Sequence, residues 1–135
     1  MSSLLEEGVK FHGHLGPYLV LGLRMGRIAF RKLKPKDLHD LSVNVWTKKT
    51  PPQSCLLDGI QVSSGCTLGK MNIEVKPARH PKAIFRNGKR ALLVKPSKQV
   101  TDLLETLSPR TTQVELRRIS LLLYQMSDHA LLVIE

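Results

Sequence analysis

The run from Pro17 to Leu33 constrains the fold of this chain more than any other segment. Pro17 suits the first position of a helix, and the apolar side chains that follow recur at helical spacing, which predicts a helix over 17–33. These apolar side chains are Leu21, Met25, Ile28, Ala29 and Leu33. Gly22 and Gly26 lie four residues apart, so we expect another stretch of backbone to pack closely against this helix. The basic side chains Arg24, Arg27 and Arg31 are predicted to line its opposite face.

The remaining sequence predicts one α+β domain over residues 1–135, without repeats or linkers. Apolar periodicity and end signals predict four or five helices and a small mixed or antiparallel sheet of four or five strands. Ser2 or Ser3 is expected to cap the first helix, and Thr112-x-x-Glu115 is a capping box that opens the last. Further helices are predicted over 2–9, 54–64, 97–107 and 112–126, the last with Leu116, Ile119, Leu122 and Leu123 inside. Strands are predicted over 41–47, 71–75, 82–86, 90–95 and 130–134, the last as an edge strand.

Asn87-Gly88 is the strongest turn signal in the chain. This dipeptide favours a β-hairpin in which both central turn residues adopt positive φ. The strands over 82–86 and 90–95 are therefore expected to pair on either side of it.

The formal net charge is +10, and two segments carry the excess. Residues 24–36 and 76–100 contain many lysines and arginines and no acidic residue, and both read as ordered structure. A basic surface suits nucleic acid, but only 4% of the residues are aromatic, which leaves few platforms for base stacking. A solvated basic surface that meets acidic partners is therefore favoured over nucleic-acid binding.

The sequence also disfavours a membrane-spanning protein and a secreted one. The run from Tyr18 to Leu23 ends at Arg24, far short of the roughly 20 residues that a membrane span needs. The acidic N-terminus does not read as a signal peptide. We therefore expect a cytoplasmic protein that does not bind membranes.

Two histidines one residue apart precede the 17–33 helix, in Phe11-His12-Gly13-His14-Leu15-Gly16-Pro17. An extended chain would turn both imidazoles to one side, which is a modest metal signal. The alternative is one surface histidine and one core histidine that is hydrogen-bonded to the backbone.

Cys55 and Cys66 are the two cysteines of the chain, and a cytoplasmic protein rarely keeps a disulfide. Cys55 and Asp58 share a face of the predicted 54–64 helix, whereas Cys66 lies in a glycine-flanked turn. Two thiolates with one or two imidazoles form a donor set suited to zinc or a similar divalent transition metal. The alternative is that both cysteines are small buried hydrophobes.

Three blocks of this sequence together resemble the FmdE family, named for one of the subunits of formylmethanofuran dehydrogenase. The blocks are Phe11-His12-Gly13-His14-Leu15-Gly16-Pro17, Cys55-x-x-Asp58-x-Ile60-Gln61, and Gly65-Cys66-Thr67-Leu68-Gly69-Lys70-x-Asn72. The order of the remaining elements matches as well, so the resemblance covers nearly the whole chain. It implies an α+β homodimer with a metal-binding pocket.

The resemblance also implies functional residues. His14, Cys55 and Cys66 are the expected ligands, with His12 as a fourth ligand or an outer residue. The residues expected to line the pocket or hold its loops are Asp58, Gln61, Thr67, Lys70 and Asn72. Neither a pterin nor a nucleotide is expected on this chain alone.

The sequence departs from the family in two places. Many members read His-Gly-His-Leu-Cys-Pro-Gly, and Gly16 stands here at the cysteine position, which favours an open site over a closed structural one. The cysteine-rich zinc module at the C-terminus of longer members has no counterpart in this short form.

Three functions follow as alternatives. The first is a small metal-binding protein whose open site supports Lewis-acid chemistry, with Lys70 on an anionic substrate group. Without metal, Cys66 would be a candidate nucleophile, its pKa lowered by Lys70. The second is a non-catalytic accessory subunit that docks an acidic partner or a larger oxidoreductase. The third, less favoured, is a nucleic-acid-associated protein.

Overall fold

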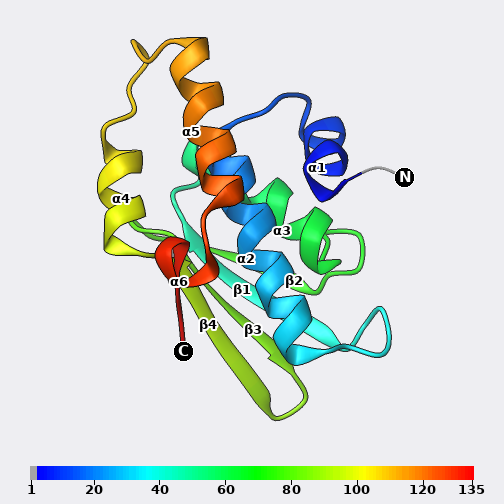
Figure 1. Cartoon of the computed structure of the whole chain (residues 1–135). Helices are drawn as coiled ribbons and strands as arrows, with labels where there is room; N and C mark the ends of the chain where they lie inside the picture. The colour runs from blue at the N-terminus through cyan, green and yellow to red at the C-terminus, as the bar shows by residue number, and fades with distance from the viewer. Residues whose placement is uncertain (1–2) are drawn as a thin grey trace.

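In the computed structural model, which describes residues 3–135, helices pack on one face of a five-stranded sheet (Figure 1). The strand order is β2-β1-β3-β4-β5. β1 and β2 run parallel and the other neighbours antiparallel, so the sheet is mixed. The strands are β1 (Leu41–Thr47), β2 (Ile73–Pro77), β3 (Lys82–Asn87), β4 (Arg90–Pro96) and β5 (Leu132–Ile134). The predicted α+β class is confirmed.

Six α-helices and one short 3-10 helix lie in the described residues. They are α1 (Leu4–His12), α2 (Pro17–Leu33), η1 (Gln53–Cys55), α3 (Leu56–Ser64), α4 (Lys98–Glu105), α5 (Gln113–Gln125) and α6 (Asp128–Leu131). The helix beyond the predicted four or five is α6, one turn that Ser127 caps just before the edge strand β5. The predicted helix over 2–9 instead extends to His12, with a capping box between Ser3 and Glu6. The alternative cap Ser2 lies outside the described residues.

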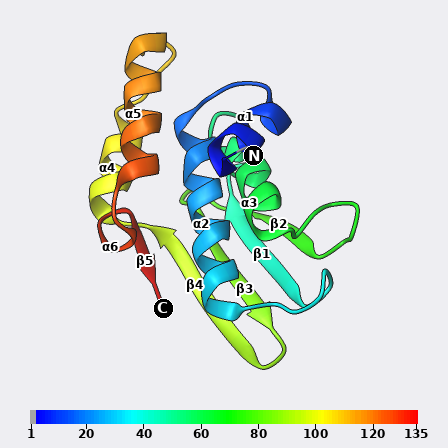
Figure 2. The ribbon, with the colours of Figure 1, turned by 45° about the vertical axis from the view of Figure 1, so that its right-hand side comes forward.

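The predicted close approach at the glycines of α2 is confirmed, and its partner is α3. A Cβ on Gly22 would lie 2.0 Å from the carbonyl oxygen of Leu56. From the other side, a Cβ on Gly59 of α3 would lie 2.3 Å from the carbonyl oxygen of Leu19. The two helices therefore pack backbone to backbone, which fixes α3 against the first half of α2 (Figure 2).

Arg24 does not line an outer face, as the spacing predicted; it is only 3% exposed. Its guanidinium donates to the carbonyl oxygens of Leu123 at 2.9 Å and Tyr124 at 3.0 Å, and pairs with Asp128 at 2.8 Å. The last carbonyls of a helix have no partner within it, and here a cation from α2 satisfies those at the end of α5. Leu122, predicted inside, is 43% exposed because α5 turns Ile119 and Leu123 toward the core.

The hairpin is confirmed, but the predicted turn is displaced by one residue. Asn87 pairs with Arg90, so Gly88 and Lys89 are the central residues. Only Gly88 has a positive φ, 62°, which fits a type II′ turn with glycine first. The side chain of Asn87 instead donates to the carbonyl oxygen of Leu33 at 2.8 Å and ties the hairpin to the end of α2.

Some element ends and one cap differ from prediction, and the strand predicted over 130–134 begins only at Leu132 because α6 runs to Leu131. The second strand begins at Ile73 rather than Met71, whose φ of 58° is incompatible with a strand. Only half of the predicted capping box forms at α5: Thr112 accepts from the backbone of Glu115, while the Glu115 carboxylate binds Arg118. The helix capped by Ser97 ends at Glu105 rather than residue 107.

Candidate functional site

His12 and Asp58 form the centre of the candidate site. His12 is the last residue of α1, and Gly13 ends the helix in the left-handed conformation. Asp58 lies in the first turn of α3, and its Oδ2 is 2.6 Å from Nδ1 of His12. An ionised carboxylate can only accept, so the proton in this contact belongs to Nδ1. A neutral His12 ring therefore carries its lone pair on Nε2.

The other ring nitrogen of His12 has no protein partner. Nε2 is buried, and within residues 3–135 no hydrogen-bond partner reaches it. A buried polar atom without a partner is costly unless another group satisfies it. An imidazole held by a carboxylate at one nitrogen and free at the other is the usual arrangement of a metal-ligating histidine.

His14 lies beside His12, with the two ring centroids 4.5 Å apart. Its side chain is exposed. The neighbouring Gly16 has extended backbone, and a Cβ there would lie 3.7 Å from Nε2 of His14, an ordinary van der Waals distance. A Cβ therefore has room at this position, where many members of the family that the chain resembles carry cysteine.

Cys55 ends η1 and immediately precedes α3, one turn before Asp58. Its half-buried side chain lines a cavity of about 300 Å³ that Gly16, Pro17 and Leu116 also border. Burial, and then the charge of Asp58, raise the pKa of the Cys55 thiol. Without a cation beside it, this cysteine stays protonated at neutral pH.

Cys66 lies at the opposite end of α3. The nine residues of that helix span about 13 Å at 1.5 Å per residue, so the two cysteines are well separated. Cys66 is fully buried in the hydrophobic core, and its Sγ lies 3.4 Å from the carbonyl oxygen of Leu41. The four predicted ligands therefore do not converge: His12, His14 and Cys55 lie around the start of α3, and Cys66 does not.

Cys66 also lacks the features of an activated nucleophile. Burial raises the pKa of its thiol, and this outweighs the opposing effects of the Ser64 hydrogen bond and of Lys70. The expectation that Lys70 lowers this pKa below its ordinary value is thus wrong, because loss of hydration dominates. Cys66 matches the alternative interpretation, a small buried hydrophobe.

Four of the predicted pocket residues hold the loop after α3. Asn72 accepts from the backbone of Thr67 at 2.8 Å and donates to the carbonyl oxygen of Leu41 at 3.1 Å. Gln61 accepts from the backbone of Leu68 at 3.1 Å, and Nζ of Lys70 donates to Thr67 Oγ1 at 3.0 Å. Lys70 is therefore occupied in this loop. Of the five predicted residues, Asp58 alone contacts the histidine pair.

The structure also reveals a second cavity, of about 470 Å³, that sequence reasoning missed. It is bordered by Lys48, Arg79 and His80, and it shares Tyr18, Pro52 and Leu107 with the cavity at Cys55. These residues come from α2, from loops and from the segment after α4, so no local spacing in the sequence connects them.

Two kinds of feature are absent from the described residues, a preformed cluster of metal ligands and a membrane-spanning helix. In residues 3–135 no three histidine, cysteine, aspartate or glutamate side chains are grouped so that they could hold a metal ion. Within the same range, no helix has both the length and the apolar character needed to cross a membrane.

Comparison with known proteins identifies one curated relative. Over 74 residues the chain is 38% identical to a "Probable S-adenosyl-L-methionine-binding protein" of Archaeoglobus fulgidus. The similar region covers 54% of this chain and 20% of that protein. The chain thus matches about a fifth of the relative's length.

The family comparison covers far more of the chain. The model described as "FmdE, Molybdenum formylmethanofuran dehydrogenase operon" matches residues 11–131, from Phe11 before the histidine pair to Leu131 at the end of α6. Both cysteines, the glycine contact of α2 and α3, and the whole β3–β4 hairpin lie within the match. The chain therefore belongs to the FmdE family.

Proposed function

We propose that this FmdE-family protein binds one zinc or similar divalent transition metal ion at the start of α3, with His12, His14 and Cys55 as ligands. The observation that carries the proposal is the buried Nε2 of His12, which has no partner in residues 3–135 while Asp58 holds Nδ1 at 2.6 Å. A metal ion at Nε2 would satisfy that atom. Cys66 is left out, because it lies in the core at the far end of α3.

The donor set fits such an ion. Two imidazoles and one thiolate suit zinc, and three protein ligands leave one position open to water or substrate. An ion held in this way supplies Lewis-acid chemistry or a bound hydroxide near neutral pH. The gap left at Gly16, where many relatives carry cysteine, keeps that position open.

Asp58 has two effects in this proposal. It fixes the tautomer and orientation of His12, as outer-shell carboxylates do. It also helps to keep Cys55 protonated while no cation is present, since its charge adds to burial in raising the pKa of that thiol. Zinc must displace this proton, so binding should release protons and tighten as pH rises.

The test is a zinc titration of the metal-free protein, followed by calorimetry and by elemental analysis of the product. We expect one zinc per chain, and a loss of affinity of at least roughly tenfold in His12→Gln. The matched control is His39→Gln, an exposed histidine that lies apart from the site. Equal zinc binding by His12→Gln and the parent protein would overturn the proposal.

Two further variants keep the test sharp if His12→Gln folds poorly. Asp58→Asn leaves all three ligands in place and should weaken zinc by roughly 10- to 100-fold, the usual effect of losing an outer-shell partner. Gly16→Cys should strengthen binding, because its Cβ has room 3.7 Å from His14. A Gly16→Cys protein with unchanged zinc affinity would contradict the placement of His14 at the metal.

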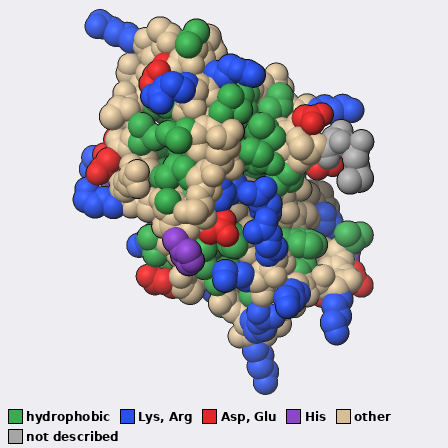
Figure 3. Space-filling model, in the orientation of Figure 1, with side chains coloured by type: hydrophobic (Ala, Val, Ile, Leu, Met, Phe, Trp, Pro, Cys, Tyr) green, Lys and Arg blue, Asp and Glu red, His purple; other side chains and the backbone are tan. Residues whose placement is uncertain are grey.

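We propose as a second candidate that the chain serves as an accessory component on an acidic partner such as a larger oxidoreductase. The observation that favours it is that the two basic segments meet. Arg90 donates to the carbonyl oxygen of Lys32 at 2.6 Å, and this contact joins the hairpin to the end of α2. Lysines and arginines gather over that half of the molecule in Figure 3, while apolar side chains gather over the other half.

Co-purification from native extract tests this candidate. Charge reversal at Lys32 and Lys89 should release an acidic partner protein, whereas His12→Gln should not. Retention of the same partner by the charge-reversed protein would overturn it.

Two further expectations have tests of their own. Sedimentation of the purified chain tests the homodimer that the family resemblance implies. Retention on DNA tests nucleic-acid binding, and retention that disappears at about 0.15 M salt would identify only non-specific attraction.

We also retain the cytoplasm as the proposed location. Both cysteines are free and lie at opposite ends of α3, an arrangement that suits a reducing compartment.

A further inference from the structure

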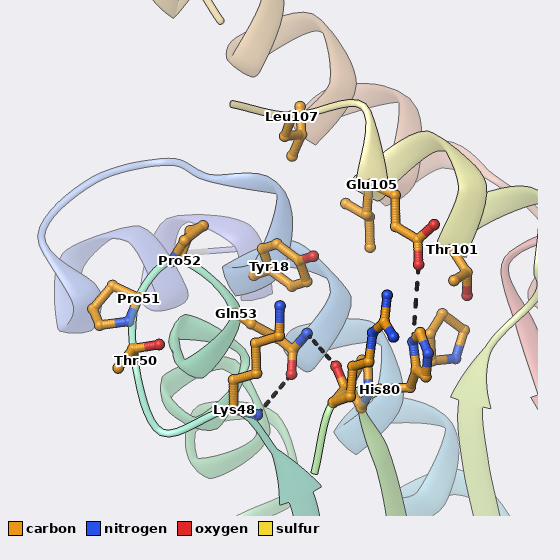
Figure 4. A pocket seen from close by; sticks show the side chains of 14 residues that line it. Tyr18, Lys48, Thr50, Pro51, Pro52, Gln53, His80, Thr101, Glu105 and Leu107 are labelled. Carbon is orange, nitrogen blue, oxygen red and sulfur yellow. Dashed lines mark hydrogen bonds and ion pairs between the residues drawn. The ribbon is translucent and has the colours of Figure 1, made fainter. Parts of the chain in front are cut away.

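The cavity of about 470 Å³ lies between three parts of the chain that are distant in sequence (Figure 4). Lys48 and Thr50 border it from the segment after β1, His80 from the segment before β3, and Glu105 from the end of α4. In Figure 4 the ring of Tyr18 lies in the middle of this group, between Gln53 and Leu107. The cavity is large enough for a small molecule.

The charges around this cavity favour an anion. Glu105, its one acidic residue, lies 3.9 Å from His80, so its charge has a partner when His80 is protonated. Within residues 3–135, no carboxylate oxygen lies within 4.0 Å of the Lys48 ammonium or of the Arg79 guanidinium. Two cations therefore face the cavity without an acidic partner from the described chain.

A buried amide fixes these two residues relative to each other. Gln53 is only 7% exposed. Its Oε1 accepts from the backbone N–H of Lys48 at 2.7 Å and from Oγ1 of Thr47 at 3.0 Å, and its Nε2 donates to the carbonyl oxygen of Arg79 at 3.1 Å. The backbones that carry both cations are thus held in place, and the side chains remain free to meet a ligand.

Tyr18 adds a neutral donor. Burial raises the pKa of its phenol, with Glu105 adding to this and the hydrogen bond to Gln53 opposing it. Its hydroxyl therefore stays protonated at neutral pH and can donate to an oxyanion.

The basic cavity adjoins an apolar one. Tyr18, Pro52 and Leu107 border both this cavity and the cavity of about 300 Å³ at Cys55. The further lining of the second cavity is mostly apolar, with Pro17, Pro109 and Leu116. A ligand that filled both would carry its charge at one end and an apolar group at the other.

We infer that the two cavities form one site for a small amphipathic organic anion. Its carboxylate or phosphate lies between Lys48 and Arg79, and its apolar part lies against Leu107 and Leu116, facing Cys55. This site goes beyond the proposed metal function and does not depend on it, because Lys48, Arg79 and Tyr18 are not proposed zinc ligands. It also assigns to Lys48 and Arg79 the anion contact that the sequence suggested for Lys70.

Calorimetry on the metal-free protein at about 50 mM salt tests the inference, because weak screening preserves contacts with partly exposed charges. The probes are 4-phenylbutyrate, phenyl phosphate and the uncharged 4-phenylbutyramide. At least one anion should bind with a Kd below roughly 1 mM, and the amide should bind roughly tenfold more weakly or worse. The tighter of the two anions identifies the preferred charged group.

Matched variants locate the binding. Lys48→Gln and Arg79→Gln leave the backbone hydrogen bonds of Gln53 intact, and each should weaken the anion by roughly tenfold. Lys49→Gln removes the same charge from an exposed neighbour that does not border the cavity, and should change the Kd less than about twofold. Thermal melting of all three checks that they fold.

Three results would overturn the site: no binding of either anion, equal binding of the amide, or an equal loss in Lys49→Gln. Zinc titration of the same variants separates this inference from the metal proposal. Lys48→Gln and Arg79→Gln should bind zinc as the parent protein does. In the parent protein, zinc binding without binding of either anion would show that the anion site has failed, and anion binding without zinc binding would show that the metal proposal has failed.

Discussion

A cysteine lies at each end of α3, and the two ends differ in how completely the protein satisfies their polar groups. After the helix, Cys66 is fully buried, Ser64 accepts from its backbone at 3.1 Å, and Asn72 ties the following loop to β1. Before the helix, Cys55 borders a cavity, and the buried Nε2 of His12 has no partner in the described chain. Cysteine next to glycine and polar residues is thus no mark of a site by itself. The mark is the buried ring nitrogen of His12 that the described chain leaves without a partner.

The largest expected difference is in thiol labelling. Cys55 should react with a maleimide in the native protein, whereas Cys66 should react only when the core opens. Because opening a stable core costs several kcal/mol, we expect protection of Cys66 by roughly 1,000-fold or more relative to Cys55. Mass spectrometry of partially labelled protein measures both rates. Similar rates at the two cysteines would break the comparison.

The next largest effect is on stability, at the contact that holds both ends of α3 in place. Alanine normally favours a helix over glycine, but a Cβ on Gly22 would lie 2.0 Å from the carbonyl oxygen of Leu56. We expect Gly22→Ala to lower the free energy of unfolding by about 3 kcal/mol or more. Gly69→Ala is the control, since a Cβ there has no neighbour within 4 Å. Equal denaturant midpoints for the two variants would refute the close packing of α2 and α3.

A smaller loss of stability should distinguish the Cys66 end of α3 from the Cys55 end. Asn72→Ala removes the acceptor of the Thr67 backbone and a donor to Leu41, which should cost about 1–2 kcal/mol. Zinc affinity should not change, because this loop lies at the far end of the helix. Urea unfolding and zinc titration measure the two effects. If Asn72→Ala kept its stability but lost zinc affinity, the metal would lie at the Cys66 end of α3, which would contradict our account.

The smallest effect is on the pH dependence of Cys55 labelling. Burial and the Asp58 carboxylate both raise the pKa of this thiol, so its labelling rate should still be rising above the pH at which an ordinary thiol levels off. Asp58→Asn removes the negative charge, which lowers the pKa and moves the profile to lower pH. The matched profile is that of Asp37→Asn, a carboxylate in an exposed loop. If Asp58→Asn and the parent protein had the same pH profile, burial alone would set the pKa of the Cys55 thiol.

Local signals in the sequence anticipated much of the fold. The cap at Ser97, the strand over 41–47 and the apolar stripe of α2 depend on neighbours within one helical turn or along one strand, and all three formed as expected. The glycines of α2 even indicated a close partner, although not that Gly59 would supply it.

Long-range partners could not be anticipated in the same way. The spacing of Arg24 marks a helix face, but its burial depends on carbonyl oxygens about one hundred residues later in the chain. Cys55 and Cys66 are close in sequence, yet the rigid length of α3 separates them. Lys48 and Arg79 border one cavity because Gln53, the pairing of β1 with β2 and a backbone hydrogen bond from Ala78 to Thr47 hold their two loops together.

The most direct test of the central claim compares the two cysteines. Zinc per chain and zinc affinity would be measured in Cys55→Ser and Cys66→Ser, with circular dichroism to confirm that both fold. Serine at Cys66 can still donate to the carbonyl oxygen of Leu41, which should preserve the core. Our account predicts that Cys66→Ser binds one zinc as the parent protein does and that Cys55→Ser loses at least roughly tenfold in affinity. Loss of zinc from folded Cys66→Ser, with Cys55→Ser unaffected, would contradict it.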